Sequence, residues 1–285
     1  MSAESPSAAE TATASAAASA VELVSEGPAL LTLEGNVALL TLNRPDAANG
    51  LDMEMLEGVR ACLRRCHDAR VRVVVLTGRG AHFCAGGDVH AFAAQGADLP
   101  YYIRRATSLL QEVIVALIRL DAPVIAAVQG YAAGGGGLGL VCACDLVFAA
   151  QSAKFLAGAT RVGMAPDAGL SVTLPRLVGA RKAAEFLLGN PTWTAPEALA
   201  HGLINHVVAD AALTDAVRTY AEKLERGAPL ALAATKRLLW SGVGLGVEAA
   251  MPEESRTVSE LCRSADVHEG LAAVIAKRAP RFEGR

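Results

Sequence analysis

The stretch from residue 122 to residue 145 constrains the fold of this chain more than any other part of it. It opens with a short apolar run, residues 124–128, whose β-branched side chains predict a buried strand. Four consecutive glycines follow at positions 134–137, and the apolar segment 138–144 then predicts a buried helix. A strand, glycines and a helix start together form an anion-holding arrangement, because the first amides of a helix lack intrahelical acceptors and the helix dipole favours negative charge.

Two kinds of anion fit such a site: a bound phosphate, or an oxyanion that exists only during a reaction. Gly134, Gly136 and Gly139 satisfy the G-x-G-x-x-G pattern of dinucleotide sites, but a run of four glycines makes this match almost by accident. Residues 154–159 contain no acid to hold a ribose, and no Gly-Lys-Ser/Thr follows for a P-loop. A glycine-rich helix packed on a strand, without any ligand, is the structural alternative.

A second glycine loop lies upstream. Residues 73–76 predict another buried strand, which runs into Gly78 and Gly80 and then into Phe83-Cys-Ala-Gly-Gly-Asp88. Two units of strand and glycine loop can direct two backbone amides at one point. The pair therefore favours a site for a reaction oxyanion over a phosphate site.

These segments resemble the crotonase superfamily, the enoyl-CoA hydratase/isomerase family. Its signature F-[CS]-A-G-x-D matches residues 83–88, and P-V-I-A-A-V-x-G-x-A-x-G-G-G matches residues 123–136. Shorter matches are L-N-R-P at 42–45, L-P-R-L-V-G at 174–179, G-L-I at 202–204 and K-R-x-P-x-F at 277–282. The resemblance implies an α/β fold, a crotonase-like spiral of ββα units with a C-terminal helical extension. It also implies an acyl-CoA thioester substrate, no separate cofactor, and a homotrimer or a dimer of trimers.

The same resemblance implies a set of site residues. The backbone amides of Ala85 and Gly135 are expected to stabilise a thioester enolate, and the loop carbonyl at Ala47 is expected to meet the adenine of coenzyme A. Lys277 and Arg278 are expected near a CoA phosphate, of the same or a neighbouring subunit. The residues expected against the substrate are Ala47, Ala85, Gly86, Gly87, Asp88, Gly134, Gly135, Lys277 and Arg278.

The chain departs from the family at its acids. Hydratases carry two glutamates; the first column falls on Leu138 or Gly139, depending on the alignment, and the second falls on Ala159. With both acids missing, water is not easily activated, so we expect an isomerase before a hydratase. Asp167 occupies the column where isomerase members carry a catalytic aspartate.

Several alternatives stay open for Asp167. It precedes the helix predicted from residue 170 and could simply cap it. It could also be a nucleophile for substitution or hydrolysis, as in dehalogenase members, although Gln111 and Ala159 replace the histidine and tryptophan expected there. The broad hydratase reaction and a CoA-ester binding protein without turnover are the remaining alternatives.

Composition limits the possible partners, the cellular compartment and the domain organisation. The formal net charge of −3 gives no general attraction for nucleic acid or membrane, and 52% hydrophobic residues supply a large core and a subunit interface. Six cysteines without a C-x-x-C pair predict reduced thiols and a cytoplasmic, reducing compartment. We expect a disordered Ala/Ser/Thr-rich tail at residues 1–24, an α/β core at 25–208 and a helical oligomerisation region at 209–285.

Overall fold

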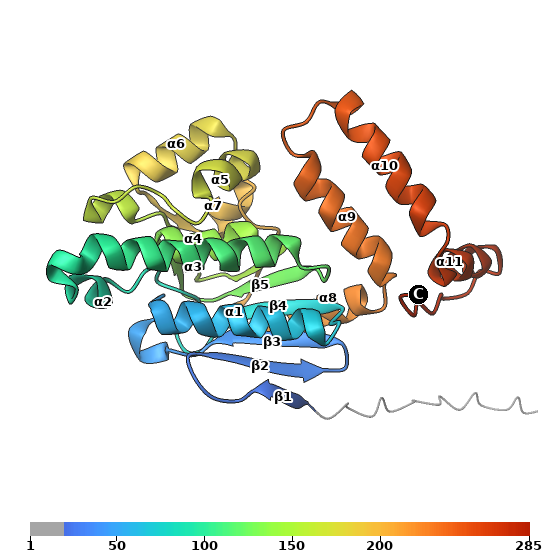
Figure 1. The fold of residues 1–285 in the computed structure, drawn as a ribbon, viewed down its shortest axis with the longest axis horizontal. Helices are drawn as coiled ribbons and strands as arrows, with labels where there is room; N and C mark the ends of the chain where they lie inside the picture. Colours follow the sequence, from blue (N-terminus) through green and yellow to red (C-terminus); the bar gives the residue numbers. More distant parts are fainter. Residues whose placement is uncertain (1–19) are drawn as a thin grey trace, which may run out of the picture.

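The computed structural model describes residues 20–285, and it has an α/β core with a separate helical lobe at its C-terminal end (Figure 1). Most of the tail predicted for residues 1–24 lies outside the described residues. Its predicted end is wrong, because Val21–Val24 forms strand β1, which pairs with β2. No helix within residues 20–285 is long and apolar enough to cross a membrane.

The main sheet has seven strands in the order β1-β2-β3-β4-β5-β7-β10. The first three strands pair antiparallel, and from β3 onward every pair is parallel. All five residues of β5 are buried, as expected for a strand covered on both faces of a parallel sheet. Besides β1, the strands are β2 (Ala29–Glu34), β3 (Val37–Leu42), β4 (Val73–Gly78), β5 (Val124–Val128), β7 (Leu146–Ala150) and β10 (His206–Val208).

Helices α1 (Met53–Asp68) and α8 (Leu213–Glu225) pack directly on this sheet, and a further helix packs on α1. Helix α1 packs on β2 and β3 and on helix α3 (Leu99–Arg119), which in turn contacts helix α4 (Gly134–Ala143). Asp52 caps α1, since its side chain accepts a hydrogen bond from the Met55 amide at 2.8 Å. Helix α8 contacts β3, β4, β5 and β7. It therefore belongs to the core, which extends past the predicted boundary at residue 208.

A second, small sheet lies beside α4. It consists of β6 (Tyr131–Ala133), β8 (Lys154–Leu156) and β9 (Thr192–Thr194). The sequence pattern does not predict these strands, because three residues are too few to show a period. Around them lie α5 (Leu170–Val178), α6 (Ala180–Gly189) and α7 (Ala195–Ala200), together with the 3-10 helix η3 (Ala159–Val162).

Helices α9 (Pro229–Gly242), α10 (Val247–Leu261) and α11 (Ala265–Ile275) form a lobe at one end of the core (Figure 1). A buried ion pair joins the lobe to the core: Lys236 Nζ lies 2.8 Å from the Asp145 carboxylate and also donates to the carbonyls of Leu117 and Ala122. Trp240 donates to the other oxygen of the same carboxylate at 3.2 Å.

Candidate active site

Two glycine loops meet at the carboxyl ends of β4 and β5. A Cβ built on Gly86 would stand 2.7 Å from the Ala133 carbonyl oxygen, and one built on Gly134 would stand 2.9 Å from the Gly86 Cα. Both glycines also have positive φ angles, 95° for Gly86 and 67° for Gly134. The loops thus lie closer together than any side chain allows. A hydrogen bond of 2.8 Å from Ala133 N–H to the Cys84 carbonyl holds them together.

The first loop offers a different amide from the one predicted. Ala85 N–H donates to the Ala48 carbonyl at 3.0 Å, so this contact contradicts the expectation that Ala85 is an oxyanion donor. Gly87 N–H, two residues on, has no acceptor among the described residues, while Gly86 N–H faces the Cys84 sulfur at 3.4 Å. The motif match could not separate these amides, because a backbone donor leaves no mark on the side chains around it. Gly87 is the available donor in this loop.

The second loop supplies Gly135. Helix α4 begins at Gly134 and not at the predicted Leu138, so the four glycines form its first turn. Its N-cap residue, Ala133, provides no side-chain cap, and the first amides of a helix have no intrahelical acceptor. Gly135 N–H, the second in the helix, is therefore free of the usual partners and carries the positive end of the helix dipole.

The Asp167 carboxyl group lies directly against Gly135. The three atoms nearest to the Cβ position of Gly135 are Oδ1, Cγ and Oδ2 of Asp167, and Oδ1 overlaps that position. The helix-cap alternative is wrong, because helix α5 has Gly169 at its N-cap and no side-chain cap; Asp167 contributes only its carbonyl, which accepts from Leu170 N–H at 2.9 Å. Burial raises the pKa of the Asp167 carboxyl, although a hydrogen bond from its own backbone amide acts in the opposite direction.

The backbone around Asp167 is held in an unusual conformation. Ala168 is buried and has a φ of 51°, and Gly169 follows with a φ of 76°. A non-glycine residue in the left-handed region costs of order 1 kcal/mol and persists where its surroundings demand it. The methyl group of Ala168 packs on Gly139, where a Cβ would collide with it. This close packing of the Asp167 loop on α4 keeps the carboxyl group beside Gly135.

No acid stands in the two hydratase columns of this structure. Leu138 is fully buried in the core, Gly139 has no room for a side chain, and Ala159 begins η3. The column of the first hydratase glutamate therefore holds no acid, whichever of the two alignments is used. Among the candidate acids singled out in the sequence, Asp167 is the one that lies at the α4 amide.

An aromatic pair that sequence reasoning missed lies beside the Gly87 amide. Phe92, in α2 (Val89–Ala93), packs its ring on Gly87, where a Cβ would stand 2.5 Å from the ring. Tyr102 of α3 contacts Phe92 edge to face with ring centroids 6.0 Å apart, and burial raises the pKa of Tyr102. The only sequence signal was an aromatic residue one turn after Asp88. These rings form an apolar wall next to the proposed donor.

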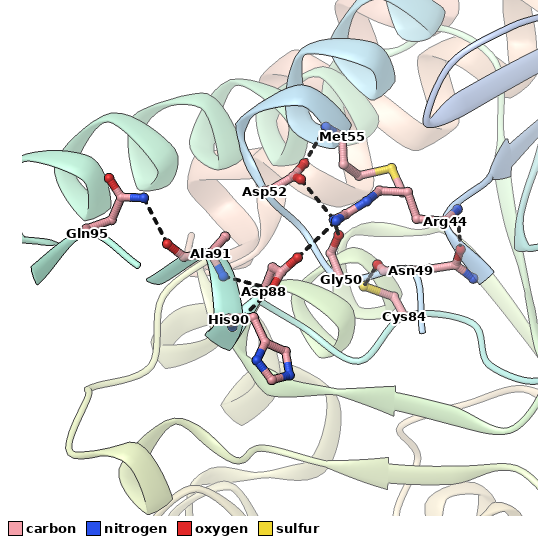
Figure 2. Close-up of polar contacts among 10 residues, drawn as sticks. All are labelled: Arg44, Asn49, Gly50, Asp52, Met55, Cys84, Asp88, His90, Ala91 and Gln95. Atoms are coloured by element: carbon pink, nitrogen blue, oxygen red, sulfur yellow. Dashed lines mark hydrogen bonds and ion pairs between the residues drawn. The ribbon is translucent and has the colours of Figure 1, made fainter. Parts of the chain in front are cut away.

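The loop between β3 and α1 is bound to the first glycine loop along its length (Figure 2). Asn49 is fully buried, donates to the carbonyls of Arg79 and His82 at 3.0 and 2.8 Å, and accepts the thiol of Cys84 on its own carbonyl. Burial raises the pKa of Cys84 to about 12, so this thiol stays protonated and donates. Ala47 is exposed at the end of η1 (Pro45–Ala47), and its carbonyl already accepts from Gly50 N–H at 2.9 Å.

The two predicted phosphate cations lie away from these loops. Arg72, at the amino end of β4, donates to the Phe282 carbonyl at 3.0 Å, whereas the 83–88 loop follows the carboxyl end of that strand. Figure 1 likewise places α11 and the C-terminus at the end of the sheet opposite α2. Arg278 is also engaged by Glu269 through two contacts of 2.6 and 2.7 Å. Lys277 and Arg278 therefore do not join the site of their own chain.

Within residues 20–285 no group of three or more His, Cys, Asp or Glu side chains is arranged to hold a metal ion. Five cysteines are buried and Cys262 is exposed, and none of the six forms a disulfide.

Comparison with known proteins gives consistent results. The family model described as enoyl-CoA hydratase/isomerase matches residues 32–285. A probable enoyl-CoA hydratase of Rhodobacter capsulatus is 39% identical over 87% of this chain and 95% of its own length. The (E)-benzylidenesuccinyl-CoA hydratase of Thauera aromatica is 38% identical over 90% and 99%, and the 1,2-epoxyphenylacetyl-CoA isomerase of Escherichia coli is 35% identical over 89% and 97%. The crystal structure of an enoyl-CoA hydratase from Polaromonas sp. JS666 superposes with a TM-score of 0.86 at 32% identity, covering 90% of this chain and 99% of that one.

Proposed function

This chain belongs to the enoyl-CoA hydratase/isomerase family, and from that premise we propose that it shifts a carbon–carbon double bond in an acyl-CoA thioester through an enolate. One observation carries the proposal: the Asp167 carboxyl group lies against the Gly135 end of α4, while both hydratase columns lack an acid. The fold is the crotonase fold, as its solved relatives indicate. The acyl-CoA class of substrate follows from the family.

The proposed reaction needs one base and two donors. The Asp167 carboxylate removes a proton from the carbon next to the double bond, and the C–H electron pair moves through the conjugated system to the thioester oxygen. The amides of Gly87 and Gly135 donate to this oxygen as its charge develops, where one such donor is typically worth about 2.7 to 4 kcal/mol. The same carboxyl group then returns the proton to the other end of the allylic system. The cycle consumes no cofactor and leaves Asp167 ionised.

Hydration is the second candidate, because the two relatives with the highest identities above are described as hydratases. In that reaction Asp167 would take a proton from water as the water oxygen adds to the β-carbon, and the enolate would then be protonated at the α-carbon. Substitution or hydrolysis with Asp167 as nucleophile is less favoured, since Gln111, the residue in place of the expected histidine, is exposed on α3.

A panel of enoyl-CoA esters in deuterated water tests the proposal. An isomerase exchanges the α and γ protons of the substrate and forms the shifted alkene without a change in mass other than deuterium uptake. A hydratase yields a 3-hydroxyacyl-CoA, heavier by one water. Tight binding of the esters without exchange or turnover would contradict both reactions and leave a CoA-ester binding protein.

We also propose that the helical lobe mediates assembly into a trimer or a dimer of trimers. Its helices and the α9–α10 connection expose large apolar side chains that a second copy would cover: Leu239, Val243, Leu245, Val247, Met251, Val258, Leu271, Val274 and Ile275. Exposed apolar patches of this kind mark interaction surfaces. Lys277 could then approach the CoA of a neighbouring subunit, whereas Arg278 would first have to leave Glu269.

A further inference from the structure

A short bridge fixes the direction of the proposed donor amide at Gly87. Leu51 N–H donates to the Gly86 carbonyl at 2.7 Å, and Asp88 N–H donates to the Leu51 carbonyl at 3.1 Å. The Gly86 carbonyl and the Gly87 N–H belong to one peptide plane, and in a trans peptide they point in opposite directions. The hydrogen bond from Leu51 therefore aims the Gly87 N–H, and it also polarises that peptide so that the amide becomes a stronger donor.

The Arg44 side chain contacts both chain segments that form this bridge (Figure 2). Its Nη1 lies 3.0 Å from Asp52 Oδ2, and its Nη2 lies 3.0 Å from Asp88 Oδ2. Asp52 directly follows Leu51, and Asp88 directly follows Gly87. The planar guanidinium group thus spans the two residues that flank the bridge, which the single ammonium of a lysine cannot do with the same geometry.

The two carboxylates that Arg44 joins are themselves fixed. Asp52 Oδ1 caps α1 through Met55 N–H, and Asp88 Oδ1 caps α2 through the amides of His90 and Ala91 at 3.0 Å. Burial by itself would raise the pKa of Asp88, but the Ala91 amide and the Arg44 guanidinium hold it below its ordinary value. Asp88 therefore stays ionised, and both of its oxygens are committed to defined partners.

We propose that Arg44 is a positioning residue that aims the Gly87 amide at the thioester oxygen. This inference rests on the proposed function, since it takes Gly87 as an oxyanion donor. A purely structural role for Arg44 makes a different prediction: its loss would lower stability without changing how strongly the bound thioester carbonyl is polarised. Both roles involve the same ion pairs, so the polarisation of the bound thioester carbonyl is the observation that distinguishes them.

The test compares wild type with Arg44→Met, Arg44→Lys and Arg60→Met. Arg60 is the matched control, because it also forms an ion pair, with Glu112 at 2.8 Å, and its side chain is 31% exposed against 25% for Arg44. The probe is butyryl-CoA with an isotope-labelled thioester carbonyl, which is saturated and cannot isomerise. Difference infrared spectroscopy measures how far binding lowers the carbonyl stretching frequency, and steady-state kinetics on an enoyl-CoA measures kcat and KM.

Wild type and Arg60→Met should show the same frequency shift. Arg44→Met should lose most of the shift and about 10- to 100-fold in kcat with little change in KM, because complete loss of one oxyanion donor costs about 100- to 1,000-fold. The frequency shift and kcat of Arg44→Lys should lie between those of wild type and Arg44→Met. If Arg44→Met does not fold, Arg44→Lys provides the test. A full shift and normal kcat in folded Arg44→Lys and Arg44→Met would overturn the inference, whereas no shift in wild type would instead overturn the oxyanion site of the proposed function.

Discussion

Replacing Asp167 by asparagine separates the proposed chemistry from the fold. Asparagine keeps the size of the side chain, so the contact with Gly135 is retained. The backbone hydrogen bond from Leu170 N–H to the carbonyl of residue 167 does not depend on the side chain. Helix α5 also begins without help from the Asp167 side chain. The substitution therefore removes one base and little else.

The expected loss follows from the role of that base. A positioned general base contributes about 100- to 10,000-fold, so kcat should fall by that factor, equivalent to roughly 2.7 to 5.4 kcal/mol at 1.36 kcal/mol for each tenfold change. In wild type, kcat/KM should rise with pH through the pKa of Asp167, because only the carboxylate accepts a proton. Burial raises that pKa above the ordinary value of 3.8, so the acid limb lies above this value and is absent from Asp167→Asn.

Stability should change in the opposite sense. An ionised carboxylate whose pKa is raised by burial destabilises the folded chain above that pKa, and this cost disappears as pH falls to the unfolded value. Asp167→Asn should therefore have a higher Tm than wild type at neutral pH, with the difference closing in acid. The assay is deuterium exchange and product formation from enoyl-CoA esters, with Asp215→Asn, an exposed aspartate paired with Arg218 on α8, as the control. Near-normal turnover by Asp167→Asn, or its failure to fold, would refute this reasoning.

Other predictions follow from single contacts. Gly135→Ala should lose at least about 100-fold in kcat, because its Cβ overlaps the Asp167 carboxyl group; Gly242→Ala, with open space around it, is the control, and equal kcat in both variants would contradict the geometry. Lys236→Met should destabilise the fold in urea unfolding by up to about 3 kcal/mol, because the largely buried Asp145 carboxylate loses its cation but keeps the Trp240 donor, and a loss no larger than that of exposed Lys182→Met would contradict it. Light scattering should show a trimer or hexamer for wild type and smaller species for Leu239→Glu; a wild-type monomer at micromolar concentration would rule out the assembly.

The sequence predicted the parts of the fold that have a clear period or a long apolar run. Strand β5 was predicted at residues 124–128 and is found there, and the strand predicted at residues 73–76 lies within β4. Strands β1 and β2 were missed, although β2 alternates between buried and partly exposed residues. The strands of the small sheet depend on tertiary pairing, so no local pattern could have indicated them.

The candidate site shows a similar division. Motifs placed Gly86, Gly134 and Gly135 correctly at the junction of two loops, because a close approach of backbones requires glycine and therefore appears in the sequence. They could not tell whether Ala85 or Gly87 has a free amide, since this depends on where the carbonyl of Ala48 lies. The motif at residues 277–278 likewise does not say which end of the sheet its cations reach, so their approach to the CoA of a neighbouring subunit stays a prediction.

Two residues in left-handed conformations and one carboxyl group whose pKa is raised by burial lie beside the proposed chemistry. Ala168 adopts a left-handed conformation beside a partly buried carboxyl group, and Asn49 does so in a fully buried position beneath the first glycine loop. Neither residue is a glycine, and each contacts a segment of the proposed site: Ala168 packs on α4 next to Asp167, and the Asn49 carbonyl accepts a hydrogen bond from the Cys84 thiol in the first glycine loop. A fold that only needed stability could relieve both conformational costs by substitution. Both residues contact the segments that carry the Gly87 and Gly135 amides, as expected for a site of transient negative charge, because its donors must be in place before the charge appears.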